Sequence, residues 1–256
     1  AYNDYALETV FDGDPTITDP TKTFDIVFVA SGFTVPEFDN FRDFSYQQSN
    51  FLVGFDSLPG KEPFPSYKKI IKIRRLVSSS IFHIPGVWGQ KLDINVITAT
   101  LVTLGIPYDQ IVGVINSFGG RSYSYNGSYY MTLFYPNRQL IFAHELGHSF
   151  AALLDEYIET RGSESGDFDN IGRNCKTDPS ELWVDNQLGK AYLGCNYLEN
   201  LYRSEYNSLM TSFYKGDENP DYNGPSRYIL QKLLSSFTVN KALFYATPNV
   251  FNTTNN

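Results

Sequence analysis

The chain lacks two kinds of sequence that would point to a membrane or to nucleic acid. It has no apolar run of about 18 residues or more, so no segment is expected to insert into a membrane. It also has no long basic run, and its formal net charge is −8. Nucleic acid and anionic membrane surfaces are therefore poor candidates for its partners.

Neither size nor hydrophobic content limits the fold to a small or disordered class. The chain has 256 residues, of which 42% are hydrophobic. That is enough to bury a sizeable core, so the composition favours a folded chain over a globally disordered one. We expect one domain, residues 1–256, built as two lobes that share a cleft.

Histidine is scarce, with three in the chain, yet His144 and His148 are four residues apart and enclose Glu145. On a helix, residues at this spacing lie on one face, with Cβ atoms about 6 Å apart. Two imidazoles so placed can bind one zinc ion, and Glu145 can act as a general base toward zinc-bound water. The alternative is a helix that carries two incidental histidines. We expect this helix to start near Asn137, with an apolar stripe on the face opposite the two histidines.

A catalytic zinc usually takes three protein ligands and a water, so a third ligand is needed. The remaining histidine, His83, is far away in the sequence and is interpreted as an ordinary loop or core residue. The nearer candidates are Asp155 and Glu156. In a straight helix Asp155 would lie about 10 Å beyond His148. It can bind the same metal only if the helix ends near Ala152 and the chain turns back; otherwise both acids are solvent-facing or salt-bridging.

Cysteine is scarcer still, and its two positions bear on the compartment. Cys175 and Cys195 lie in a segment rich in Asn, Gly and Asp. An even count in a loop-rich segment favours one disulfide over two buried free thiols. The predicted location is therefore secreted or extracellular, which includes the periplasm and the cell surface.

Apolar runs rich in β-branched residues alternate with helical patterns along the first half of the chain. This alternation predicts an α/β (α+β) lobe over residues 1–154, with a mixed twisted sheet and the active-site helix. Residues 155–256 are expected to form a smaller, irregular lobe that ends in a helix. Residues 1–22 are interpreted as an irregular arm. The expected strands are 24–30, 67–77, 110–116 and 128–135, the last at the sheet edge, and the other expected helices are 35–55, 92–104 and 225–243.

The run His144-Glu-Leu-Gly-His-Ser-Phe150, continued by Asp155-Glu-Tyr157, resembles the active-site signature of the bacterial IgA-type zinc metallopeptidase family, a metzincin-like branch of the zincins. Further similarity lies in residues 25–33, 111–120 and 202–210, and the resemblance spans roughly residues 24–235. It implies a zincin/metzincin-like fold, zinc-dependent endopeptidase activity and a Met-turn that places Met210 under the metal.

The chain departs from the metzincin pattern just after the second histidine. A metzincin has Gly and His where this chain has Ala151 and Leu154. The carboxylate comes one residue later, so the resemblance transfers the role of third zinc ligand to Asp155, with Glu156 as the alternative. The missing glycine leaves the required turn without an explanation.

The leading hypothesis is a zinc-dependent metalloendopeptidase acting on a protein or peptide substrate, with Zn²⁺ as cofactor and Glu145 as general base. One alternative is a zinc amidase or deacylase acting on a non-protein substrate. Another is a module that binds glycan or protein and carries a non-catalytic metal. Tyr202, Arg203 and Tyr214 are candidates for stabilising the oxyanion. The sequence leaves the oligomeric state and the cleavage specificity open.

Overall fold

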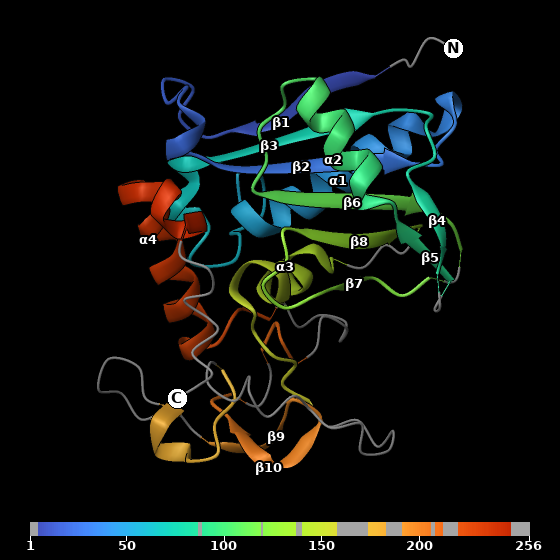
Figure 1. Ribbon diagram of the computed structural model, residues 1–256. Helices are drawn as coiled ribbons and strands as arrows, with labels where there is room; N and C mark the ends of the chain where they lie inside the picture. The colour runs from blue at the N-terminus through green and yellow to red at the C-terminus, as the bar shows by residue number, and fades with distance from the viewer. Residues whose placement is uncertain are drawn as a thin grey trace.

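The fold is mixed α/β, built on a six-stranded sheet (Figure 1). The computed structural model describes residues 5–86, 89–118, 120–136, 140–157, 174–182, 191–205, 208–211 and 220–246. Strand order across the sheet is β1 (Ala6–Asp12), β3 (Ile71–Val77), β2 (Phe24–Ser31), β6 (Gln110–Asn116), β8 (Tyr130–Tyr135) and β7 (Tyr123–Ser124). The four inner strands are parallel, and β1 and β7 run antiparallel at the two edges.

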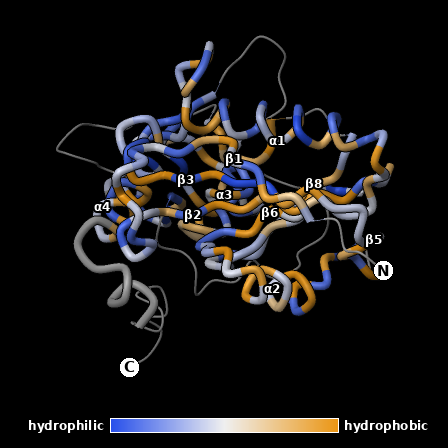
Figure 2. Tube along the Cα trace, turned by 90° about the horizontal axis from the view of Figure 1, so that it is seen from above, coloured by the Kyte–Doolittle hydropathy of each residue, from blue (hydrophilic) through white to orange (hydrophobic). Residues whose placement is uncertain are grey.

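Helices cover both faces of this sheet, and Figure 2 shows α1 and α2 on opposite sides of it. One core contains side chains from α1 (Phe38–Val53), α3 (Phe142–Ala151) and α4 (Gly224–Ala246). The other core contains Ile97 and Leu101 of α2 (Ile94–Thr103). The central strand β2 contributes Ile26 and Phe28 to the first core and Val27 to the second. Because β2 is buried on both faces, its residues 26–30 form a continuous apolar run, as is typical of parallel strands.

Shorter elements complete the fold. Two hairpins pair β4 (His83–Gly86) with β5 (Gly89–Leu92) and β9 (Tyr192–Cys195) with β10 (Leu198–Arg203). The 3₁₀ turns are η1 (Pro20–Lys22), η2 (Val35–Glu37), η3 (Pro65–Ile70) and η5 (Pro179–Leu182). In Figure 1 helix α3 lies between the sheet and the β9–β10 hairpin.

Three expectations about the sheet were wrong. Residues 6–12 form a strand rather than part of an irregular arm, because β1 pairs along β3 even though most of its side chains stay exposed. The segment 67–70 belongs to the 3₁₀ turn η3, which begins at Pro65, and the strand starts only at Ile71. Strand β8 is not the edge, because β7 covers its outer side at Thr132 and Met131.

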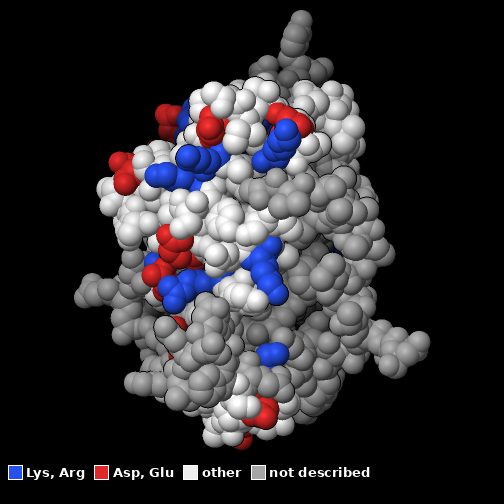
Figure 3. All heavy atoms as spheres, turned by 90° about the vertical axis from the view of Figure 1, so that its left-hand side faces the viewer, with Lys and Arg blue, Asp and Glu red and all other residues white. Residues whose placement is uncertain are grey.

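The C-terminal helix packs on the sheet. Leu230, Leu234 and Phe237 of α4 are buried in the same core as Phe24 and Phe150. Within the described residues, no helix is both long and apolar enough to cross a membrane. On the face seen in Figure 3, Lys and Arg side chains lie among Asp and Glu side chains rather than in one continuous basic patch.

Candidate metal centre

Helix α3, which carries the His-Glu-x-x-His run, lies inside the molecule. It begins at Phe142 after a cap at Ile141, later than the expected start near Asn137, which itself lies outside the described residues. All ten of its residues are buried, so the face that carries the two histidines is enclosed as well as the apolar stripe, whose Phe142, Leu146 and Phe150 lie in the core shared with α1 and α4. The sheet core and the segment after the helix enclose it from two sides.

The chain turns back directly after this helix. Ala152 has φ 47° and ψ 38°, in the left-handed region. The N–H groups of Ala152 and Leu153 donate to the carbonyls of His148 at 2.8 Å and Gly147 at 3.0 Å, which closes the helix end. The reversal brings Asp155 beside the two histidines. This is the turn that a role for Asp155 as ligand required, and an alanine makes it.

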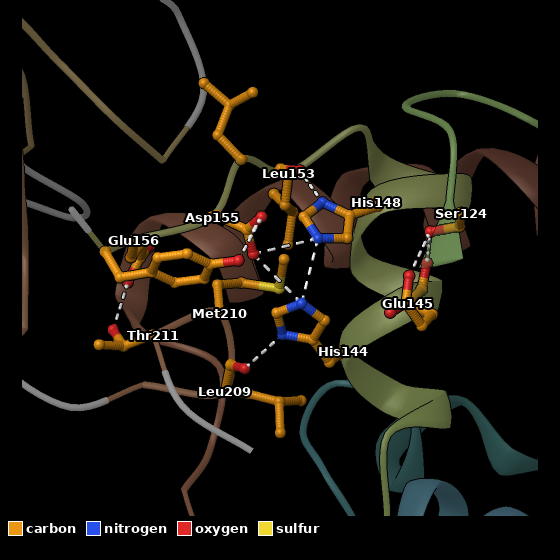
Figure 4. A network of polar contacts seen from close by, with 12 residues as sticks. Ser124, His144, Glu145, His148, Leu153, Asp155, Glu156, Leu209, Met210 and Thr211 are labelled. Carbon is orange, nitrogen blue, oxygen red and sulfur yellow. Dashed lines mark hydrogen bonds and ion pairs between the residues drawn. The ribbon is translucent and has the colours of Figure 1, made fainter. Parts of the chain in front are cut away.

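Three buried atoms of different residues form a triangle at this point (Figure 4). Nε2 of His144 lies 3.1 Å from Nε2 of His148. Asp155 Oδ1 lies 3.2 Å from the first of these nitrogens and 3.3 Å from the second. Tetrahedral zinc with bonds of about 2.0–2.1 Å separates its ligand atoms by about 3.3–3.4 Å. His144, His148 and Asp155 are therefore a group that could hold a metal ion and leave a fourth position open.

The far side of each imidazole fixes which nitrogen faces the triangle. Nδ1 of His144 is 2.8 Å from the Leu209 carbonyl, and Nδ1 of His148 is 2.6 Å from the Leu153 carbonyl. A carbonyl only accepts, so each Nδ1 carries the proton and donates it, and in a neutral ring Nε2 then presents a lone pair. Within the described part of the chain, Asp155 Oδ1 accepts no hydrogen bond. Three electron-rich atoms thus converge in a buried space, an arrangement that fits a cation.

The close approach of His148 and Asp155 shifts the pKa values of both side chains. Burial disfavours the charged ring of His148, but the Asp155 carboxylate outweighs burial, and the Glu145 carboxylate adds to it, raising the pKa of His148 to about 9. Burial alone would raise the pKa of Asp155. The two imidazoles outweigh this effect and hold the pKa of Asp155 well below the ordinary value. The Asp155 carboxylate is therefore ionised, and below about pH 9 the His148 ring beside it carries a second proton, which a bound metal ion would displace.

Glu145 is held from the edge of the sheet. Its side chain is buried, and Ser124 Oγ of β7 lies 2.9 Å from Glu145 Oε2 and 2.8 Å from the Glu145 carbonyl oxygen. In Figure 4 the Glu145 side chain lies toward Ser124, whereas both imidazoles lie toward Asp155. Ser124 lies between the expected strands 110–116 and 128–135, where no helix, strand or functional residue was expected.

Met210 lies against the helix between the two histidines. It is fully buried in a turn closed by a hydrogen bond of 3.0 Å from the Thr211 N–H to the Ser208 carbonyl. A Cβ added to Gly147 would come within 2.7 Å of Met210 Sδ, so a larger residue there would force the Met210 side chain to shift. The preceding residue of the same turn, Leu209, supplies the carbonyl that orients His144.

Glu156 lies outside the metal group and links three segments of the chain instead. Its carboxylate is fully buried, and burial raises its pKa, although its hydrogen bonds oppose this rise. It accepts from Ser208 Oγ at 2.5 Å, Asn174 Nδ2 at 2.9 Å and Asn223 Nδ2 at 2.5 Å. Its own N–H donates to the Met210 carbonyl at 2.9 Å. Of the two acids considered, Asp155 faces the histidines and Glu156 anchors the methionine turn.

A disulfide joins Cys175 to Cys195, as the sequence predicted, and it indicates an oxidising, extracellular-type environment. The residues next to the two cysteines hold the ligand segment on both sides. Asn174 exchanges hydrogen bonds of 2.8 and 2.7 Å with the Leu154 backbone, and the Asn196 N–H donates to the Asp155 carbonyl at 2.6 Å. The disulfide therefore joins the two segments, at residues 174 and 196, that hydrogen-bond to the chain around Asp155.

The other sequence candidates have different places. His83 lies in β4 with its Nδ1 2.7 Å from Ser31 Oγ, apart from the metal group. Arg203 donates from its Nη1 to the carbonyls of Leu193, at 2.7 Å, and Gly194, so it fastens the β9–β10 hairpin. The backbone of Tyr202 pairs with Lys176, and Tyr214 falls outside the described residues.

The chain was also compared with known proteins. A scan against protein-family models finds no match, and a search of curated proteins finds none either. The features of the molecule that bear on its function are therefore the side chains of this site: a buried His, His and Asp group that could hold a metal ion, with a buried Glu on the same helix.

Proposed function

We propose that the protein is a zinc-dependent metalloendopeptidase that is exported and hydrolyses peptide bonds in a protein or peptide substrate. The observation that carries this proposal is the buried triangle of His144 Nε2, His148 Nε2 and Asp155 Oδ1, with sides of 3.1–3.3 Å. Two imidazoles and one carboxylate form a set of three protein ligands that suits catalytic rather than structural zinc. The disulfide supports the exported location.

The chain's own residues then have separate tasks. When bound, zinc would supply Lewis acidity, which activates water and polarises the scissile carbonyl. Glu145 would take the proton from the attacking water and deliver it to the leaving amine. Ser124 would orient Glu145 through its hydrogen bond of 2.9 Å to Oε2. The carbonyls of Leu153 and Leu209 would keep both imidazoles in the metal-binding tautomer.

The position of the turn supports the resemblance to metzincin-like peptidases. In the metzincin pattern the turn glycine precedes the third ligand by three residues. In this chain the left-handed residue is Ala152 and the carboxylate is Asp155, which preserves that spacing with both positions moved by one residue. Asp155, which replaces the His of the metzincin pattern, can thus reach the metal through the same kind of chain reversal after the helix.

Glu145→Gln tests the general-base role directly. The variant should keep one zinc per chain by elemental analysis, because all three ligands remain. Hydrolysis of a peptide library should fall by about 10²–10⁴-fold, because the base is lost. Glu62→Gln, a change of the same kind at an exposed carboxylate, should leave both unchanged.

Two outcomes would reject the proposal. Activity of Glu145→Gln within tenfold of the unmodified protein would remove Glu145 from the chemistry. Zinc-loaded protein that cleaves no peptide, but releases product from a panel of amide-linked non-protein substrates, would favour an amidase or deacylase instead.

A further inference from the structure

The two oxygens of Asp155 have different surroundings. Oδ1 faces the histidines, whereas Oδ2 accepts hydrogen bonds from two phenolic hydroxyls, those of Tyr157, at 3.1 Å, and Tyr197. The two tyrosine rings contact each other edge to face, with centroids 5.3 Å apart. Tyr157 is two residues beyond the ligand, and Tyr197 comes from the tip of the β9–β10 hairpin. A local residue and a distant one therefore meet at the same oxygen.

Tyr197 reaches this oxygen at a cost in backbone conformation. Asn196 and Tyr197 have φ 49° and 63°, both left-handed, at the turn of the hairpin. Such two-residue turns favour Asn followed by Gly, because an aromatic residue at the second position is strained in the left-handed region. The turn is held by the Tyr197 N–H, which donates to the Tyr157 carbonyl at 3.0 Å, and by the disulfide at Cys195. A strained residue that directs its hydroxyl at a ligand points to a role in the site.

We propose that Tyr157 and Tyr197 are positioning residues of the metal centre, which occupy Asp155 Oδ2 so that the carboxylate offers only Oδ1 to the metal. An ion bound through one oxygen and two nitrogens would have three protein ligands and would keep a fourth position for water or substrate. A carboxylate free to bind through both oxygens would take up that fourth position or raise the coordination number. This inference rests on metal binding, the first half of the proposed function.

The pair also bears on which metal the site selects. Calcium takes six to eight oxygen ligands and commonly binds carboxylates through both oxygens. A carboxylate restricted to one oxygen, beside two imidazoles, disfavours calcium and suits zinc. The hydroxyls of Tyr157 and Tyr197 would thus contribute to selectivity without touching the ion.

Removing the hydroxyls one at a time tests the proposal. Tyr157→Phe and Tyr197→Phe keep the rings and lose the hydrogen bonds to Oδ2. Tyr157→Phe also loses the hydrogen bond of 3.3 Å that Arg121 Nη2 donates to the Tyr157 hydroxyl. Zinc affinity, measured by competition with a chromophoric chelator, should weaken about 10-fold or more in each, and further in the double variant. Tyr46→Phe is the matched control, because the Tyr46 hydroxyl also donates to a carboxylate, Asp56 at 2.7 Å, away from the site.

Two further measurements separate positioning from general support of the fold. Cobalt bound in place of zinc should show the intense visible absorption of four-coordination in the unmodified protein and the weaker absorption of five-coordination in the double variant. Tyr197→Gly removes the hydroxyl and relieves the left-handed strain. It should therefore leave the metal-free protein as stable as before, or more stable, while zinc affinity falls as in Tyr197→Phe.

The proposal is overturned if the double variant binds zinc within twofold of the unmodified protein, or if its cobalt spectrum is unchanged. A loss of metal-free stability in Tyr197→Gly with zinc affinity intact would also overturn it. These results are independent of peptidase activity. If the protein binds zinc but hydrolyses no peptide, the proposed peptidase function fails and the role of the tyrosines stands.

Discussion

Ala152 decides whether the three candidate ligands can meet. The spacing of His144 and His148 is a helical property, so the sequence predicted that these two share one face. The third ligand depends on a left-handed residue, and the sequence offers no glycine where the metzincin pattern has one. Alanine can take φ 47° only at a cost of roughly 1–2 kcal/mol, which no local sequence preference reveals. The prediction of Asp155 as third ligand therefore depended on a turn that the sequence did not explain, and the resemblance alone favoured Asp155 over Glu156.

Glycine substitutions at two neighbouring positions test where the turn lies. Ala152→Gly should raise the free energy of unfolding by up to about 1 kcal/mol, because glycine accepts the left-handed conformation, although its greater unfolded-state entropy offsets part of the gain. Ala151→Gly, inside the last turn of α3, should lower it by about 1 kcal/mol. Urea unfolding of the metal-free variants measures both. The reverse order would place the turn at residue 151.

The strands that are buried on both faces could be predicted from the sequence. The strands that are defined only by hydrogen bonding to a neighbouring strand could not. Strands β2 and β6 are continuous apolar runs because helices cover both of their faces. Strand β1 is mostly exposed and is defined by its ladder with β3. Strand β7 has two residues, too few for any periodic pattern to appear. The missed strand matters most, because its Ser124 contacts Glu145.

An edge strand next to the proposed base suggests how an extended peptide could bind. Within the described residues β7 is the last strand of the sheet on this side, so a substrate could pair with it by main-chain hydrogen bonds. N-methylation of alternate substrate amides, at least two residues from the scissile bond, should raise KM by about 2–10-fold, as expected for the loss of one hydrogen bond. Methylation of the intervening amides should change KM less than twofold. An effect without this alternation would exclude strand pairing.

At the scale of the whole molecule, the ligands come from two parts that fold around different anchors. His144 and His148 belong to a helix embedded in the main core. Asp155 belongs to a segment that is bounded by Asn174 and Asn196, next to the disulfide, and is packed beside a small cluster of Leu154, Leu201 and the two cysteines. The sequence predicted the disulfide from the number of cysteines and the ligands from their motif. It could not show that the two features are in contact, because that depends on tertiary structure.

This contact predicts that the disulfide and the metal stabilise the protein cooperatively. Replacing both cysteines by alanine should lower the free energy of unfolding by about 3 kcal/mol in the chain-entropy model for a loop of this length. Zinc at about 100 times its dissociation constant should add about 2.7 kcal/mol to the unmodified protein. The same zinc concentration should add less to the double-alanine variant, because the segment carrying Asp155 is no longer clamped and binds more weakly.

Chemical unfolding with and without zinc, in both proteins, completes a cycle that measures this coupling. His148→Ala is the control: it keeps the disulfide, so it should lose the increment from zinc while still losing stability when the disulfide is reduced. If zinc adds the same increment with and without the disulfide, the two act independently, and the clamp on Asp155 has no part in metal binding. A smaller increment without the disulfide would mean that reducing conditions weaken the site as well as the fold, so that the metal centre is fully formed only where the disulfide can form.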